Sequence, residues 1–197
     1  CLYNTLLNSN WEITCVDLSF AINLEKMVGK YEDKVSSNTR RNLKIANSSN
    51  LCIKACIDDN EIEKAYEVIY LNHDAKGYPL RMTMERVKDT LKIVPHYVYA
   101  VYIGEIMIAS AFIYRVTNDI VQVIYWGDRP GYENTKVMNY LCQELIRIFN
   151  KIGFKYMDIG ISTELGKPNY GLCDFKDSIG CERTAKFQIS KRLQSDV

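Results

Sequence analysis

The chain has 197 residues, of which 47% are hydrophobic and 25% charged, a length and composition ordinary for a globular domain with its own core. Its net charge of +1 gives no overall field toward nucleic acid or an anionic membrane, and no apolar run approaches the roughly 20 residues that a membrane span needs. Seven cysteines without a Cys-x-x-Cys spacing and only two histidines argue against a disulfide scaffold and against a metal site. We therefore expect a reduced, cytoplasmic protein without a metal ion.

The first quarter of the chain predicts a strand, two helices and a second strand. Residues 11–18 alternate as a strand does, and residues 23–34 have helical apolar spacing. The Ser and Thr side chains at 36–39 can cap a second helix over residues 40–46, and residues 51–57 read as a strand. Because the chain begins with Cys1 rather than Met, we expect residues 1–35 to be the tail of an upstream domain and residues 36–197 to form the main domain.

The middle of the chain predicts two helices and then three antiparallel strands. Asp58 and Glu61 form a capping box for a helix over residues 59–73, and Thr83 caps a shorter one. The following strand patterns are separated by short turns, which is typical of a β-meander; they cover residues 96–103, 106–116 and 120–126. A turn-rich loop then leads into the strongest helix pattern, residues 135–152.

The last quarter holds the most informative pattern. Residues 155–162 alternate as a strand and end in polar side chains; we interpret residues 171–180 as a glycine- and lysine-bearing loop and residues 184–190 as a last strand. Strand ends beside loops are where α/β proteins usually place ligands. The elements together predict an α/β fold of the α+β type, with a central, mostly antiparallel mixed sheet flanked by helices.

Two motifs in this region carry a resemblance to a known fold family. The strand end Asp158-Ile-Gly-Ile-Ser162 and the pair Phe175-Lys176 resemble the C-terminal half of GNAT-fold transferases, and above all the FemAB-like branch. The resemblance covers residues 38–191 and implies an acyltransferase. It implies transfer of an acyl or aminoacyl group from acetyl-CoA, another acyl-CoA or an aminoacyl-tRNA to an amine acceptor, either a small molecule or a bacterial cell-envelope precursor.

The resemblance also places the phosphate groups of the donor. They would lie at the N-terminus of the helix over residues 135–152, where backbone N–H groups and the helix dipole favour anions. The cofactor-binding residues implied there are Arg129, Gly131, Asn134 and Thr135. However, Glu133 stands where the acyl-CoA pattern has a small residue, and a carboxylate beside a pyrophosphate is unfavourable. This departure counts against CoA and favours the FemAB-like branch.

The two motifs supply the candidate catalytic residues. Asp158 can act as a general base for the amine or orient the acceptor, or it can be a structural Asp that binds backbone N–H groups at the strand end. Lys176 can neutralise an oxyanion or hold a phosphate group, or it can form an ordinary surface ion pair with a neighbouring Asp. Both alternatives stay open at the level of sequence.

The candidate substrate-binding residues come from four segments. A basic helix resembles the one that opens the second FemAB-like domain, and its cations can bind a phosphate or carboxylate or simply be solvated. The aromatic candidates can form walls of an acceptor cleft or serve as packing. The full set is Arg40, Arg41, Lys44, Tyr78, Trp126, Ser162, Glu164 and Tyr170.

Two functions fit these observations. The first is a transferase with the chemistry described above. The alternative is a non-catalytic GNAT-fold binding module that has lost its donor site, which the altered phosphate loop favours. The retained D-x-G and F-K segments favour the enzyme, and the sequence predicts neither the acceptor nor the oligomeric state.

Overall fold

The computed structural model, which describes residues 2–29 and 31–192, is built on a seven-stranded sheet. The strand order is β2-β3-β4-β5-β6-β1-β9, antiparallel everywhere except between β5 and β6. The strands are β1 (Glu12–Asn23), β2 (Leu51–Ala55), β3 (His96–Ile103), β4 (Ile106–Arg115), β5 (Ile120–Asp128), β6 (Tyr156–Ile161) and β9 (Glu182–Ser190). A small hairpin is formed by β7 (Thr163–Glu164) and β8 (Lys167–Pro168). The predicted fold class is confirmed.

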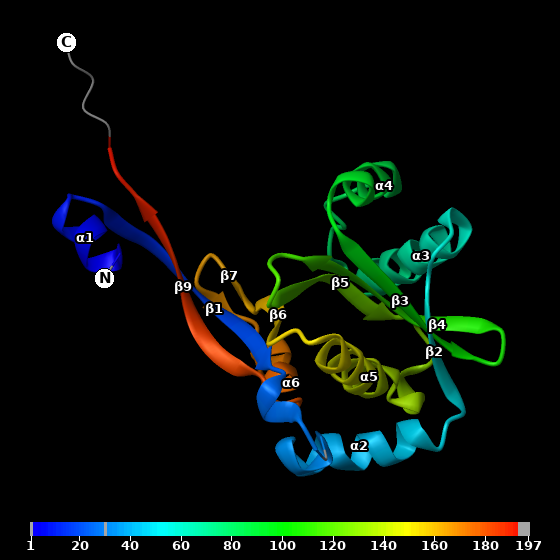
Figure 1. Cartoon of the computed structure of the whole chain (residues 1–197). Coiled ribbons are helices and arrows are strands. Elements are labelled where there is room, and N and C mark those ends of the chain that lie inside the picture. The colour runs from blue at the N-terminus through cyan, green and yellow to red at the C-terminus, as the bar shows by residue number, and fades with distance from the viewer. Residues whose placement is uncertain (1, 30, 193–197) are drawn as a thin grey trace.

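Helices cover both faces of the sheet (Figure 1). On one face α3 packs on β3, β4 and β5, with α4 beside it; on the other, α5 packs on β2, β4 and β5, and α2 packs on α5. The helices are α1 (Leu2–Asn8), α2 (Ser37–Asn47), α3 (Asp59–Ala75), α4 (Met84–Ile93), α5 (Val137–Ile152) and α6 (Tyr170–Ser178). Three 3-10 turns are η1 (Glu25–Met27), η2 (Tyr31–Lys34) and η3 (Glu133–Thr135).

Strand β4 lies between two hydrophobic clusters and is buried on both faces. Phe112 packs with the residues of α3 and α4, whereas its neighbours Ala111 and Ile113 pack with those of α5. Because side chains alternate across a strand, a central strand covered on both faces reads as a continuous apolar run. This packing holds the middle of the sheet in place.

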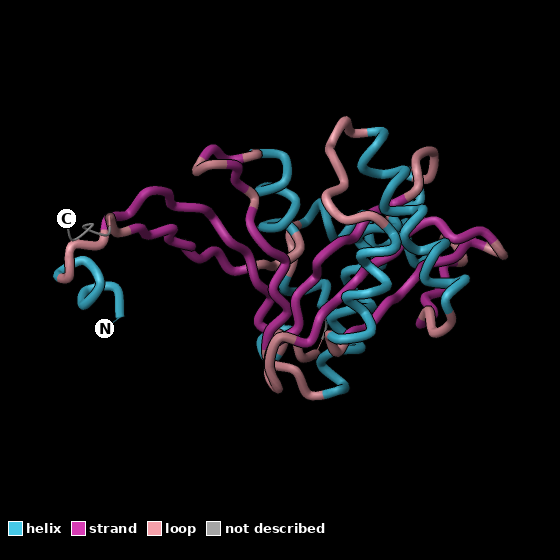
Figure 2. Tube along the Cα trace, turned by 90° about the horizontal axis from the view of Figure 1, so that it is seen from above, coloured by secondary structure: helices cyan, strands magenta, loops and turns pink. Residues whose placement is uncertain are grey.

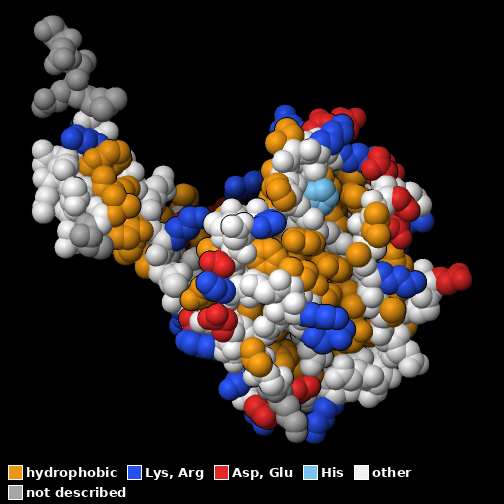
Figure 3. Space-filling model, in the orientation of Figure 1, with side chains coloured by type: hydrophobic (Ala, Val, Ile, Leu, Met, Phe, Trp, Pro, Cys, Tyr) orange, Lys and Arg blue, Asp and Glu red, His pale blue; other side chains and the backbone are white. Residues whose placement is uncertain are grey.

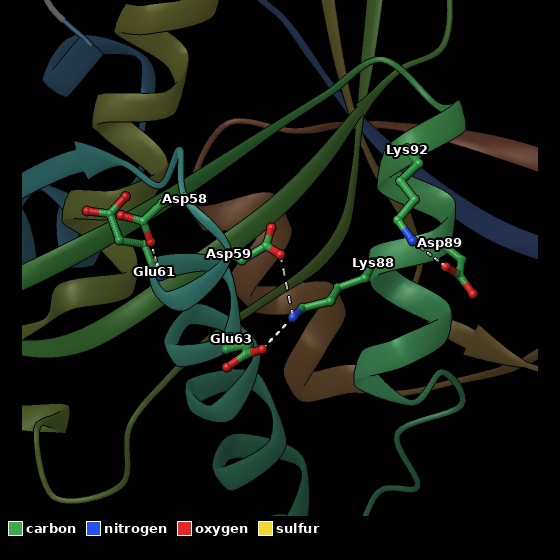
Figure 4. Close-up of polar contacts among 7 residues, drawn as sticks. All are labelled: Asp58, Asp59, Glu61, Glu63, Lys88, Asp89 and Lys92. Carbon is green, nitrogen blue, oxygen red and sulfur yellow. Dashed lines mark hydrogen bonds and ion pairs between the residues drawn. The ribbon is translucent and has the colours of Figure 1, made fainter.

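Charged contacts join α4 to the start of α3 (Figure 4). Lys88 of α4 reaches Asp59 at 3.8 Å and also bonds Glu63, while the Asp58 carboxylate caps α3 by accepting the Glu61 N–H at 2.8 Å. These pairs are exposed, so each stabilises the fold only modestly. The Asp58 cap marks the start of α3, and α3 carries Asn72, a residue of the site, near its other end.

The N-terminal strand is an integral part of the sheet. Residues Ser19 to Asn23 of β1 pair with β6, and most of β1 also pairs with β9. Beyond β6 the two outer strands continue as a ribbon that projects from the body and carries α1 (Figure 2). Hydrophobic side chains gather along this ribbon and α1 (Figure 3); the exposed ones are Leu2, Tyr3, Leu7, Ile13 and Val16. A domain boundary near residue 35 stays a prediction.

Two sequence expectations are corrected. The helix expected over residues 23–34 is interrupted at Gly29, whose φ is +96°, and two 3-10 turns replace it. The segment interpreted as a loop over residues 171–180 is instead α6, capped by Asn169, which accepts the Leu172 N–H at 3.1 Å. The glycine in the first turn, Gly171, led to the wrong prediction of a loop. The helix forms because it buries one face, which carries Cys173 and Lys176.

Candidate functional site

The sheet forks between β5 and β6. These parallel strands share only three paired positions, and the last is Gln122 opposite Asp158. Beyond this pair β5 continues along β4 as far as Asp128, opposite Ala109, while β6 turns away with β1. A fork between parallel strands leaves backbone and side chains free to meet a ligand at their carboxyl ends, as in other open α/β sheets.

A β-bulge in β6 lies at the fork. Phe20 and Ala21 are adjacent in β1, but they face Gly160 and Asp158, so Ile159 is the extra residue. Gly160 has a φ of +74°, which glycine adopts without steric cost. The Asp158 carboxylate accepts the Gly160 N–H at 2.7 Å through Oδ1 and the Gln122 side-chain amide at 3.1 Å through Oδ2. Both oxygens of Asp158 therefore hold the bulge and the fork.

Lys176 fastens the same bulge from α6. Its Nζ donates to the backbone carbonyls of Ile159, Gly160 and Ile161 at 2.9, 3.0 and 3.0 Å. The side chain is 2% exposed, and burial lowers the pKa of its ammonium to about 8. An ammonium has three N–H donors, so these carbonyls engage all of them. The D-x-G and F-K motifs thus meet in space.

Two adjoining pockets open beside the fork. The first, of about 640 Å³, is formed by the end of β6, the β7–β8 hairpin and the start of α6. The second, of about 430 Å³, lies between the end of β5, α5, α6 and the segment after α3. Tyr78, Asn169 and Leu172 line both, and Tyr78 is 54% exposed. Because they share these lining residues, we treat the two adjoining pockets as one candidate site.

Some predicted residues lie at these pockets. Ser162 and Glu164 line the first, and the Ser162 hydroxyl is buried without a partner among the described residues. Trp126 lines the second pocket and packs edge-on against Phe175, with ring centroids 6.0 Å apart. Asp158 and Lys176 lie behind this surface and line neither pocket in the described part of the chain.

The end of β5 carries a polar cluster that sequence reasoning missed. Asn72 of α3 is 6% exposed, and its Nδ2 donates at 2.8 Å both to the backbone carbonyl and to Oδ1 of Asp128. Lys76 Nζ donates to Asn72 Oδ1 at 3.0 Å. Both Asp128 and Lys76 line the second pocket. The i,i+4 spacing of Asn72 and Lys76 on a helix was the available signal, but their meeting with β5 is a tertiary contact.

Gly127 shows why this cluster is tightly specified. A Cβ at this position would lie 2.8 Å from the side-chain carbon Cγ of Asn72, closer than real contacts allow. The glycine lets α3 approach the end of β5. As a result, the Asn72 amide reaches the Asp128 carboxylate.

An exposed acidic side chain bonds a backbone N–H group of the loop before α5. Glu133 Oε1 accepts the Gly131 N–H at 2.9 Å, and the N–H groups of Gly131 and of Glu133 itself hold the pKa of this carboxyl below its usual value. The helix begins later than expected, at Val137, after Lys136 in a left-handed conformation with a φ of +55°. The Glu133 carboxylate thus accepts a hydrogen bond from an N–H group that the family resemblance assigned to a donor phosphate.

The remaining predicted residues lie apart from the pockets or point elsewhere. Arg40, Arg41 and Lys44 are exposed on α2, which packs on α5. Arg129 forms an ion pair with Glu67 of α3 at 3.9 Å, and the Thr135 hydroxyl bonds the Tyr132 carbonyl at 2.6 Å. Asn134 and Tyr170 are exposed. The structure does not bring these residues to the two pockets.

Among residues 2–29 and 31–192, no group of three or more His, Cys, Asp or Glu side chains is arranged to hold a metal ion. None of the helices in this part of the chain has both the length and the apolar character that a membrane crossing requires.

The fold and the forked sheet define a GNAT-like α/β architecture. FemX superimposes with a TM-score of 0.78 at 8% identity, over 93% of this chain and 66% of FemX. The C-terminal domain of a putative lysylphosphatidylglycerol synthetase from Agrobacterium fabrum gives 0.71 at 8%, over 98% of this chain and 65% of that one. The ribosomal-protein-S18-alanine N-acetyltransferase from Escherichia coli gives 0.52 at 12%, over 75% of this chain and 98% of the enzyme.

These structural likenesses confirm the expected GNAT-like fold, and the TM-score is higher for FemX than for the N-acetyltransferase. The chain spans about two thirds of the length of the first two structures, 66% and 65%. No protein-family model matches the sequence, and no curated protein does.

Proposed function

We propose that this chain is a transferase that moves an aminoacyl or acyl group onto an amine in the joined pockets at the β5–β6 fork. The observation that carries this proposal is the end of the β5–β6 ladder at Gln122 and Asp158, with two pockets meeting at Tyr78 just beyond it. Two pockets with a shared wall suit a reaction that joins two substrates, because each can be held with its reacting group at the boundary.

The donor in this proposal is an aminoacyl ester, as carried by tRNA, rather than acetyl-CoA. The support is the loop before α5, where the Glu133 carboxylate already accepts the Gly131 N–H. A pyrophosphate at this loop would meet a negative charge where it needs a donor. An aminoacyl-tRNA donor assigns the reaction to the cytoplasm, and the resemblance to FemAB-like proteins makes a cell-envelope precursor the proposed acceptor.

Asp158 and Lys176 act in this proposal as positioning residues. Their hydrogen bonds fix the bulge at Gly160 and hence the strand end that leads to Ser162 in the first pocket. Trp126 and Tyr78 contact the substrates as walls of the pockets. An oxyanion role for Lys176 requires its ammonium to release a carbonyl of β6.

A non-catalytic binding module is the second candidate. It is favoured by one observation: all three N–H donors of Lys176 and both oxygens of Asp158 already make hydrogen bonds within the fold. Such a module would bind substrate in the pockets without forming product.

A transfer assay separates the two candidates. The chain is incubated with a pool of radiolabelled aminoacyl-tRNA, or with labelled acetyl-CoA, and with hydroxylamine or lysine methyl ester as the amine. Because hydroxylamine attacks aminoacyl esters and thioesters unaided, product is counted only above a blank that lacks the chain. Above that blank, we expect labelled amide or hydroxamate from the tRNA pool and none from acetyl-CoA. Product from acetyl-CoA alone would contradict the proposed donor, and no product from either would favour the binding module.

Two tryptophan variants tie the activity to the pockets. Trp126→Ala removes a wall of the second pocket, whereas Trp11→Ala removes the same side chain just before β1. We expect transfer to fall in the first variant and to persist in the second. Equal loss in both would show that the fold, and not the pocket, was damaged.

A further inference from the structure

Asp128 is a carboxylate residue in the wall of the second pocket. It is the last residue of β5, six positions beyond the end of the β5–β6 ladder, and its side chain lines the second pocket together with Trp126 and Tyr78. An amine that attacks an ester must give up a proton, and a carboxylate at the pocket wall can accept it. Asp158, the sequence candidate for this role, has both oxygens engaged at the fork.

The surroundings of Asp128 hold its carboxylate in one orientation. Asn72 donates to its Oδ1 and to its backbone carbonyl, and Asn72 is itself held by Lys76. The Asp128 carboxylate is thus held by the buried Asn72 amide, and Lys76 holds that amide in turn. Such support, at the wall of a pocket, is what an acid–base residue needs to keep its position.

Charges from two elements set the protonation of Asp128. Burial raises the pKa of its carboxyl above the ordinary value; Lys76, the residue that follows α3, lowers it, and Glu133 of η3 raises it. The Asn72 amide favours the charged form. A carboxyl whose pKa lies above the usual range is a better proton acceptor at neutral pH than an exposed one, because basicity rises with pKa.

Resting on the transferase function above, we propose that Asp128 is the general base of the reaction. The amine nitrogen forms a bond to the acyl carbon, and the carbon–oxygen bond to the tRNA ribose breaks. The proton lost by nitrogen passes to the Asp128 carboxylate and from there to the leaving ribose oxygen, so the carboxylate is regenerated. Lys76, at the same pocket wall, lies where it can offset the negative charge that develops.

The test compares two amines in Asp128→Asn. This variant retains an oxygen that can accept the Asn72 hydrogen bond, so the fold is kept while the base is removed. Lysine methyl ester presents an ε-ammonium that must be deprotonated before it attacks, whereas hydroxylamine is largely uncharged at neutral pH. The proton that the hydroxylamine nitrogen loses after attack is also acidic enough to pass to water without a protein base. We expect kcat/KM for the alkyl amine to fall about 100-fold or more, with hydroxylamine little affected.

The matched control is Asp119→Asn, which changes the same group at the other end of β5, where it pairs with Lys155. It should leave both reactions unchanged. Equal rates for wild type and Asp128→Asn, or equal loss with both amines, would overturn the assignment of the base. A wild-type chain without product from any donor would instead overturn the transferase function, and with it this assignment.

Discussion

Gln122 and Asp158 face each other at the last paired position of β5 and β6, and the Gln122 amide donates to the Asp158 carboxylate at 3.1 Å. This hydrogen bond lies at the last paired position, beyond which β5 and β6 separate. The second oxygen of Asp158 accepts the Gly160 N–H, so one side chain ties the fork to the bulge.

Removing the Lys176 ammonium should destabilise the fold. In Lys176→Met the side chain keeps most of its length, but the carbonyls of Ile159, Gly160 and Ile161 lose their shared donor. Because buried acceptors without partners are costly, we expect the free energy of unfolding in urea to fall by about 3 kcal/mol. Lys186→Met, at an exposed position of β9, should change it little. A similar small change for Lys176→Met would show that the carbonyls find other donors.

The contribution of Lys176 to stability should increase at alkaline pH. Its pKa is about 8 in the folded chain against an ordinary value of 10.5, so between these values the unfolded chain binds more protons. Stability from this group is therefore lowest below about pH 8 and rises toward pH 10.5. The difference in unfolding free energy between wild type and Lys176→Met should grow by up to about 1.4 kcal/mol per pH unit in that window. A flat difference would mean that the three carbonyls keep the pKa at its ordinary value, and a falling one that they raise it.

A side chain at position 160 should strain the backbone of the bulge. Gly160 has a φ of +74° with open space around it, so Gly160→Ala is opposed by backbone strain and not by crowding. We expect a loss of about 1–2 kcal/mol in thermal or urea unfolding. Gly171→Ala, in the first turn of α6, meets only an ordinary contact of 3.8 Å and should be neutral or slightly stabilising. Equal effects of the two substitutions would contradict the role of the bulge.

Glu133 should determine whether the loop before α5 accepts a phosphate. Millimolar CoA is expected to leave the Tm of the wild-type chain unchanged, because the Glu133 carboxylate holds the Gly131 N–H. Glu133→Ala frees this donor, and binding at about 100 times the Kd would add about 2.7 kcal/mol of stability. Glu105→Ala, at the exposed turn between β3 and β4, serves as the control. A clear shift in the wild type would show that Glu133 moves aside for CoA.

Local patterns predicted the elements that depend on local chemistry. The meander of β3, β4 and β5 and the helix that ends at Gly153 follow from alternation, turns and a glycine C-cap. The position of β1 between β6 and β9 could not be predicted, because strand pairing across the whole chain leaves no local signal. The helix α6 was wrongly interpreted as a loop, since Gly171 hides its first turn.

In the candidate site, too, the sequence indicates some residues but not the tertiary contacts between them. Asp158 and Lys176 stand out in sequence by their motifs, but the hydrogen bonds that join them through Gly160 depend on the packing of α6 on β6. Asp128 and Asn72 carry no motif at all. Their contact exists because Gly127 admits α3 to the end of β5, which is a property of three-dimensional packing.

The place of β1 in the sheet also sets an order of folding. Phe20 faces Gly160 and Val16 faces Phe187, so the first strand of the chain has no partner until the last ones have been synthesised. Contacts between such distant segments form slowly, because a long loop must close before they stabilise anything. We expect the β3–β5 meander to form first and β1 to remain unpaired on the ribosome until β6 and β9 emerge, so that shortening the chain at its C-terminal end would leave its N-terminal end unfolded.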